Sequence, residues 1–175
     1  KKIKADEVGI SSIVKKLDSE VTEKQLLEII YGYNKDNNID GILVQLPLPS
    51  HINTEKIVDA ISYEKDVDGF NSKNIGLLAQ GRPYVVPCTP LGCLKLLKTE
   101  IELVGASALV IGRSNIVGRP MSYLLTNHNA TVTLAHSKTQ NLKELCKRND
   151  IIIAASGIPK MIKKDWVKDK AIIID

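Results

Sequence analysis

The stretch SALVIGRSNIVGRP, residues 107–120, decides the fold class of this chain. Its first half is a short apolar run that predicts a strand over 107–112, and a helix is predicted over 118–128. Gly112 permits a tight turn after the strand, and Gly118 lets the helix approach the strand or a phosphate closely. The free N–H groups at the helix start favour a pyrophosphate. The pattern therefore predicts a dinucleotide-binding loop made of Gly112, Arg113, Ser114, Ile116, Val117 and Gly118.

This loop departs from the usual G-x-G-x-x-G pattern. Ser114 stands where the second glycine would, and the spacing to Gly118 is longer by one residue. A glycine-containing loop that binds no ligand remains the alternative interpretation.

Strands and helices alternate on the C-terminal side of this stretch. Strands are predicted over 130–135, 150–155 and 171–175, and a helix includes 142–146. This succession is the signature of an open parallel sheet in an α/β fold.

The end of the second predicted strand bears on the choice of cofactor. NAD sites usually place an acid there for the ribose 2′-hydroxyl, whereas NADP sites offer positive charge or hydroxyls to the 2′-phosphate. Here His136 and Ser137 follow the strand, no acid is present, and Arg113 lies on the neighbouring loop. A guanidinium group suits a phosphate, so NADP is favoured and His136 and Ser137 join the predicted cofactor site. Solvated loop residues are the alternative.

The N-terminal half contains a second apolar run, DGILVQLPLP over 40–49. It predicts a strand buried on both faces, interrupted near its end by Gln45. Because a buried amide without partners costs about 1–3 kcal/mol, Gln45 either contacts a ligand or bonds neighbouring backbone, and both readings stay open. The other elements predicted in this half are a strand over 11–17 and helices over 22–36, 54–61, 74–80 and 90–99, the second half beginning near 89.

A polar turn, EKDVDGF over 64–70, places two acids around one valine. Asp66 and Asp68 could form a metal pair, supply a catalytic acid or simply cap a turn. No further carboxylate or histidine completes a metal site, so none is predicted.

Composition excludes several classes of function. The 175 residues are 43% hydrophobic and 25% charged, typical of a globular chain, and the net charge of +4 comes from scattered lysines. With no basic block and 4% aromatics, we expect no nucleic-acid partner. No apolar run reaches membrane-spanning length. Three cysteines without metal spacing fit small core residues in a reducing compartment, so we expect a cytoplasmic location, with an organellar matrix also open.

Four strings, in order and at matching spacing, carry a resemblance to a known family. They are DGILVQLPLP (40–49), KDVDGF (65–70), PCTPLG (87–92) and GRSNIVGRP (112–120). The chain resembles the bifunctional methylenetetrahydrofolate dehydrogenase/methenyltetrahydrofolate cyclohydrolase family over essentially its whole length. The resemblance implies two α/β domains around a cleft, with a folate-binding catalytic domain over 1–88 and a Rossmann-like NADP-binding domain over 89–175.

The resemblance also implies roles for individual residues. Aligning EVGI at 7–10 places the family's catalytic lysine on Lys1, with Gln45 as its polar partner and Asp68 as the carboxylate that holds the pterin ring. The implied activities are NADP-dependent oxidation of 5,10-methylenetetrahydrofolate and hydrolysis of the product to 10-formyltetrahydrofolate. This one-carbon chemistry supplies purine biosynthesis, and a homodimer is implied.

Two rival functions and a question of completeness remain. Another Rossmann oxidoreductase would make 40–49 a coincidence, and a truncated, inactive nucleotide-binding module would bind without turnover. The chain begins without Met in a lysine-rich helical segment and stops after a predicted strand, so we expect it to be cut at both ends.

Overall fold

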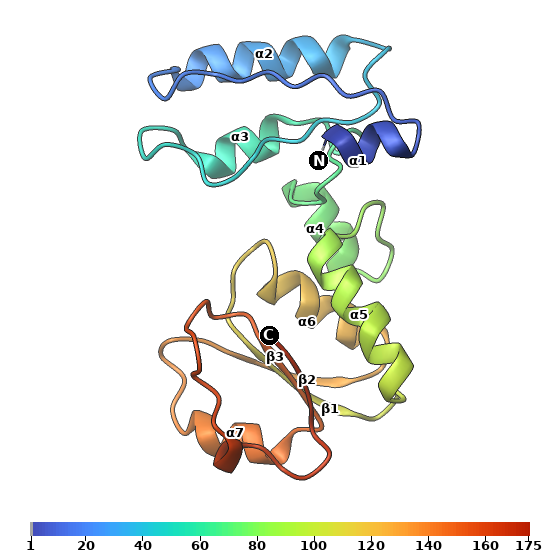
Figure 1. Cartoon of the computed structure of the whole chain (residues 1–175), viewed down its shortest axis with the longest axis vertical. Coiled ribbons are helices and arrows are strands. Elements are labelled where there is room, and N and C mark those ends of the chain that lie inside the picture. Colours follow the sequence, from blue (N-terminus) through green and yellow to red (C-terminus); the bar gives the residue numbers. More distant parts are fainter. Residues whose placement is uncertain (1) are drawn as a thin grey trace.

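The computed structural model describes residues 2–175, so Lys1 lies outside the described residues. Figure 1 shows two halves joined by a pair of helices. The first half contains α1 (Lys2–Glu7), α2 (Glu23–Lys35) and α3 (Thr54–Ala60). The joining helices are α4 (Ser72–Ala79) and α5 (Cys88–Glu100), and the second half is built on a parallel sheet.

The second half confirms the predicted α/β architecture. Its strands are β1 (Ser107–Ile111), β2 (Thr131–Ala135), β3 (Ile151–Ala154) and β4 (Ile172–Ile174), all parallel, in the order β2-β1-β3-β4. The chain moves from β1 to one side for β2 and then crosses to the other side for β3. β1 therefore borders the topological switch point, where open α/β sheets bind ligands.

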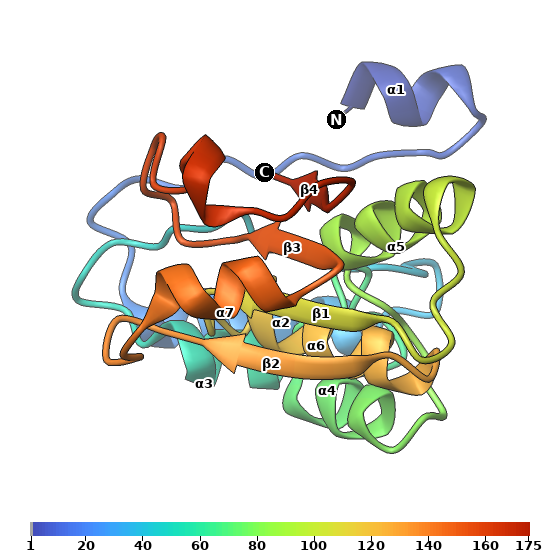
Figure 2. The same cartoon turned by 90° about the horizontal axis from the view of Figure 1, so that it is seen from below.

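Both faces of this sheet are covered. Ala108 and Val110 face a core shared with α5 and α6 (Gly118–Asn127), while Leu109 and Ile111 face α7 (Leu142–Arg148) and the short helix η1 (Lys164–Trp166). Figures 1 and 2 show α6 and α7 on opposite sides of the sheet. Since successive strand residues point to opposite faces, an apolar side chain at every position of β1 is what two covered faces require.

The strand predicted over 40–49 is wrong in its extent. Only Ile42 pairs, in an isolated parallel bridge to Asp66, and Leu43 is 38% exposed. The segment predicted as a strand over 11–17 forms no ladder either, and Ile13 is 72% exposed. A strand needs a hydrogen-bonding neighbour along its length, and residues 2–175 give this region only that single bridge.

A separate apolar core holds the first half together. It packs α2 and α3 against the bridge segment through Leu26, Ile30, Ile42, Ile52, Ile57 and Ile61. The Thr22 cap predicted for α2 is confirmed: the Thr22 hydroxyl accepts a hydrogen bond from the Gln25 N–H, and Gln25 Oε1 accepts one from the Thr22 N–H.

The start of α5 differs from its prediction. The helix begins at Cys88, with Pro87 rather than Thr89 at the N-cap position. Cys88 is exposed, contrary to the expectation of three core thiols, whereas Cys146 is buried and Cys93 half-buried. Burial raises the pKa of the Cys93 and Cys146 thiols, which keeps them protonated.

Helix α4 connects the two halves through one face. Asn74 is fully buried against the first half, where its amide donates to the Tyr63 carbonyl and the Asp66 carboxylate. One turn later Leu78 lies in the core of the second half, and its carbonyl accepts a hydrogen bond of 2.8 Å from the Asn127 amide of α6. The predicted division near residue 88 stays a prediction, since α4 packs on both sides of it.

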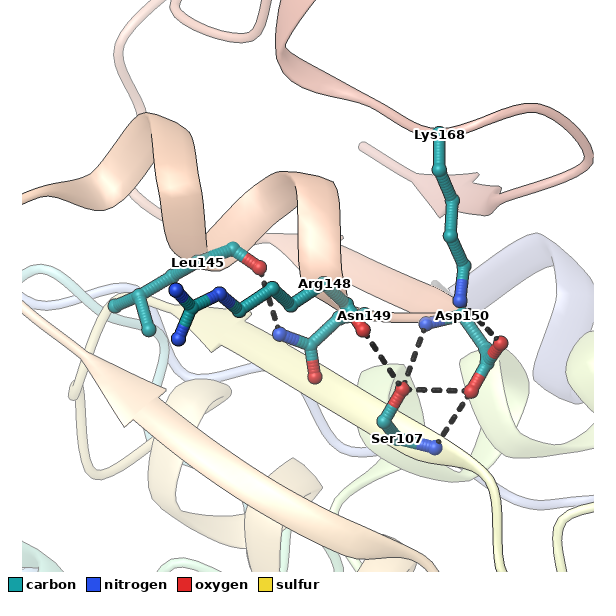
Figure 3. A network of polar contacts seen from close by, with 6 residues as sticks. All are labelled: Ser107, Leu145, Arg148, Asn149, Asp150 and Lys168. Atoms are coloured by element: carbon teal, nitrogen blue, oxygen red, sulfur yellow. Dashed lines mark hydrogen bonds and ion pairs between the residues drawn. The ribbon is translucent and has the colours of Figure 1, made fainter.

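A polar network ties the N-terminal edge of the sheet together (Figure 3). Asp150 Oδ2 accepts from the Ser107 hydroxyl at 2.6 Å and from the Ser107 N–H at 2.9 Å, and Oδ1 forms an ion pair with Lys168 at 2.6 Å. These contacts fix the starts of β1 and β3 and the approach to β4. The Lys168 ammonium and then the Ser107 donors hold the pKa of Asp150 well below its ordinary value.

Asp150→Asn tests the contribution of this charge. A depressed folded-state pKa adds stability that is complete above the unfolded pKa of about 3.9 and is lost as pH falls toward the folded pKa. The half-exposed carboxylate is screened, so we expect a loss on the order of 1 kcal/mol at pH 7 that shrinks below about pH 4. Urea unfolding at pH 7 and pH 3.5 measures it, with Asp169→Asn as the exposed control. Equal losses at both pH values would contradict a charge contribution.

Candidate functional site

The predicted cofactor loop lies at the carboxyl end of β1. Gly112 follows the strand with φ of 121°, and its N–H donates to the Ala135 carbonyl at the end of β2 over 2.9 Å. A Cβ on Gly112 would lie 2.2 Å from the Ala155 carbonyl oxygen, just after β3. The loop thus starts where the ends of three strands converge.

Close backbone contact also fixes the far end of this loop. A Cβ on Gly118, the first residue of α6, would lie 1.9 Å from the Gly112 carbonyl oxygen. Both glycines are therefore required by packing of backbone on backbone. The sequence predicted this close approach for Gly118, and for Gly112 it predicted a tight turn.

Ser114 organises the turn into α6. Its hydroxyl accepts hydrogen bonds from the Val117 N–H at 3.2 Å and the Gly118 N–H at 3.3 Å, and its carbonyl accepts from the Arg119 N–H. The serine that replaces the usual second glycine thus satisfies N–H groups at the helix start. Val117 is half-buried, whereas Arg113 and Ile116 project toward solvent.

A second loop meets the first at the same edge of the sheet. β1 and β2 pair with Ile111 opposite Ala135, so Arg113 and Ser137 each follow two residues beyond paired strand ends. The turn after β2 is closed on itself: the His136 N–H donates to the Thr139 hydroxyl, and the Lys138 N–H donates to His136 Nδ1. The structure therefore brings together the two segments that the sequence assigned to the cofactor.

The loop after β3 completes this edge, and sequence reasoning missed it. A pocket of about 190 Å³ lies there, lined by residues that include Ala154, Ser156, Met161 and Lys164. The Ser156-Gly157 pair directly after an apolar strand is the signal that would have pointed to it.

The residues predicted for the substrate lie in the first half. Ile42 and Asp66 pair in a parallel bridge. The segments that follow these two residues, which contain Gln45 and Asp68, therefore leave the bridge in the same direction. Gln45 is exposed rather than buried, and its amide donates to the Leu46 carbonyl at 2.8 Å. Asp68 is half-buried in the turn that follows the bridge. The predicted lysine, Lys1, lies outside the described residues.

The interpretation of Asp66 as a turn cap is supported by the structure. Its buried carboxylate accepts hydrogen bonds from the N–H groups of Gly69 and Asn71. Among residues 2–175, no three histidine, cysteine or acidic side chains gather in a way that could hold a metal ion. None of the helices in this range is long and apolar enough to span a bilayer.

A glycine-containing loop between a parallel strand and a helix, beside a topological switch point, defines the second half as a nucleotide-binding α/β domain. The family model described as tetrahydrofolate dehydrogenase/cyclohydrolase, NAD(P)-binding domain, matches residues 87–175. The model of the catalytic domain of the same family matches residues 1–68. The chain belongs to the tetrahydrofolate dehydrogenase/cyclohydrolase family, as its sequence strings indicated.

Individual relatives agree with this assignment. The bifunctional protein FolD of Listeria innocua is 50% identical over 176 residues, covering all of this chain and 62% of the relative. That of Bartonella bacilliformis is 53% identical, covering 98% of this chain and 59% of the relative. The chain therefore spans about 60% of the length of these relatives.

Solved structures of the family have the same fold. The bifunctional FolD enzyme of Campylobacter jejuni matches with a TM-score of 0.96 at 45% identity, covering 99% of this chain and 62% of that one. The Trypanosoma brucei enzyme, complexed with NADP cofactor and inhibitor, matches with a TM-score of 0.91 at 33% identity, covering 97% of this chain and 59% of that one.

Gly118→Ala tests the close contact at the start of α6. Because the obstructing atoms are backbone, the loop itself has to move, and we expect a loss of about 3 kcal/mol, the upper end for overpacking. Gly92→Ala in α5 is the matched control: nothing lies within 4 Å of its Cβ position, so alanine should stabilise by about 0.5–1 kcal/mol. Urea unfolding of both variants measures the difference. Similar stabilities would refute the packing requirement.

Proposed function

We propose that the complete protein oxidises 5,10-methylenetetrahydrofolate with NADP and hydrolyses the methenyl product to 10-formyltetrahydrofolate. The observation that carries this proposal is the match of a catalytic model and an NAD(P)-binding model of one family, in order, within one chain. The rival reading of residues 40–49 as a coincidence does not account for that pair of matches.

The residues at the sheet edge fit a dinucleotide. Gly112 and Gly118 keep the loop close to the sheet. The N–H groups of Gly118 and Arg119 are bonded to Ser114 rather than free, so the ten-residue helix α6 contributes the positive end of its dipole to a diphosphate. The exposed Arg113 guanidinium and Ser137 hydroxyl would hold the 2′-phosphate, and no acid follows β2 to favour NAD. Ile116, Val117 and His136 would border the bound cofactor. NADP, when bound, supplies the hydride acceptor.

The first half would bind and orient the folate. Asp68 would accept hydrogen bonds from the pterin amino and ring N–H groups, since a carboxylate is a pure acceptor. Oxidation leaves a cationic methenyl group, and water addition to that carbon requires proton transfer. We assign this transfer to Lys1, oriented by Gln45, because a neighbouring cation lowers the pKa of an amine.

The wider setting is also a proposal. The 10-formyl product is a one-carbon donor for purine biosynthesis, and the resemblance supports a homodimer. The three cysteines are free thiols, which supports a reducing compartment and hence the cytoplasm.

The complete protein with Lys1→Met tests the function and the division of roles. We expect the wild type to reduce NADP in the presence of methylenetetrahydrofolate and to hydrolyse the methenyl product. The variant should lose cyclohydrolase activity by at least about 100-fold, the lower range for a general acid or base, while retaining dehydrogenase activity. Absorbance at the methenyl and NADPH bands separates the two steps. Binding without turnover by the wild type would favour the inactive module, and equal loss of both steps would refute the role of Lys1.

Arg113→Ala tests the cofactor preference. Removal of a charged partner of the 2′-phosphate should raise the KM for NADP by about tenfold and leave the KM for NAD unchanged. Steady-state kinetics with both cofactors measures the ratio, with Arg82→Ala as a control, because Arg82 pairs with Gln80 away from this loop. An unchanged NADP/NAD ratio would remove Arg113 from the phosphate site.

A further inference from the structure

The turn that carries Asp68 is built around a buried carboxylate, that of the turn cap Asp66. Asp66 is 2% exposed. Its Oδ1 accepts from the Gly69 N–H at 3.0 Å, and its Oδ2 accepts from the Asn71 N–H at 2.8 Å and the Asn74 amide at 2.9 Å. Three donors converge on one side chain, from both the turn and helix α4.

This arrangement exceeds the needs of an ordinary turn. A buried carboxylate is costly unless hydrogen bonds satisfy it, and none of the ion pairs among residues 2–175 involves Asp66. One oxygen of a serine or asparagine would cap the Gly69 N–H alone. Two acceptor oxygens are needed to hold the turn and α4 at the same time.

The hydrogen bond between Asn74 and Asp66 is accompanied by a second unfavourable feature, a buried amide oxygen. Its side chain is fully buried, its Nδ2 donates to Asp66 and to the Tyr63 carbonyl at 2.9 Å, and its Oδ1 has no hydrogen-bond partner among residues 2–175. An unsatisfied buried oxygen is destabilising, and a leucine, which branches at the same position with the same number of heavy atoms, would avoid it. The contribution of the Asn74 amide is therefore its NH2 group, which donates to the Asp66 carboxylate and fixes it.

The backbone of Asp68 is held on both sides by this arrangement. Before it, the Ile42 N–H donates to the Lys65 carbonyl at 2.7 Å, next to the parallel bridge that pairs Ile42 with Asp66. After it, the Gly69 N–H is fixed by Asp66 Oδ1. Asp68 thus projects from a short arc whose two ends are both fixed.

We propose that Asp66, held by Asn74, is a positioning residue that fixes the Asp68 carboxylate for the pterin of the folate. This inference rests on the proposed function. Preorganised donors and acceptors lower the ordering cost of binding, so the effect belongs to folate recognition and leaves the NADP loop unchanged.

Asp66→Asn in the complete protein is the test. An asparagine in place of Asp66 turns its NH2 group toward at least one of the three donors. If the NH2 group faces the Gly69 N–H, the hydrogen bonds from the Asn71 N–H and the Asn74 amide stay intact. We expect the KM for methylenetetrahydrofolate to rise about tenfold and the KM for NADP to stay within about twofold. Asp59→Asn is the matched control, since Asp59 accepts from the Ser72 N–H at the same helix start and keeps an acceptor oxygen.

A double-mutant cycle separates positioning from general destabilisation. If Asp66 acts through Asp68, adding Asp66→Asn to an Asp68→Asn protein should change the folate KM by less than about twofold. Additive effects, an equal rise in the KM for NADP, or a response matching that of Asp59→Asn would overturn the proposal. Should Asp66→Asn not fold, Asn74→Leu removes one donor only and should give a smaller rise in the same direction.

Two failures are distinguishable in this experiment. A wild type that does not oxidise methylenetetrahydrofolate would overturn the proposed function and this inference with it. An active wild type whose folate KM is unaffected by Asp66→Asn would overturn this inference alone.

Discussion

The arrangement of this protein depends on the place of β1 between β2 and β3. Both neighbours are hydrogen-bonded to it in parallel, so three strands end at one edge and their loops must share the same small space. Gly112 lies where that crowding is greatest, within reach of the ends of both neighbours. The nucleotide loop, the turn after β2 and the pocket after β3 are all consequences of this pairing.

The second half could be predicted from its sequence because local signals and tertiary structure agree there. An apolar run, a glycine and a following helix each demand the same local structure, and burial on both faces removes ambiguity about register. The tight turn at Gly112 and the close helix approach at Gly118 were predicted, but the contact between Gly112 and the residue after β3 was not. A parallel neighbour comes from a distant part of the chain, and no local pattern identifies it.

The first half was harder to predict because strand formation depends on partners. Residues 40–49 have the composition of a buried strand, yet only Ile42 finds a ladder partner among the described residues, and Gln45 is exposed. The convergence of three hydrogen-bond donors on Asp66 could not be predicted either. Its spacing to Gly69 indicates a capped turn, but the third donor, Asn74, belongs to another element and is brought there only by packing.

Helix α4 has a mechanical consequence for ligand binding. Asn74 and Leu78 lie one turn apart on a helix of eight residues, about 12 Å long, and are buried in different halves of the molecule. The turn that contains Asp68 and helix α6, which follows the nucleotide loop, are thus connected by a short helix and not by a flexible linker. The distance between these two binding regions is therefore fixed before any ligand binds. Little conformational entropy of the protein is lost when ligands occupy both regions.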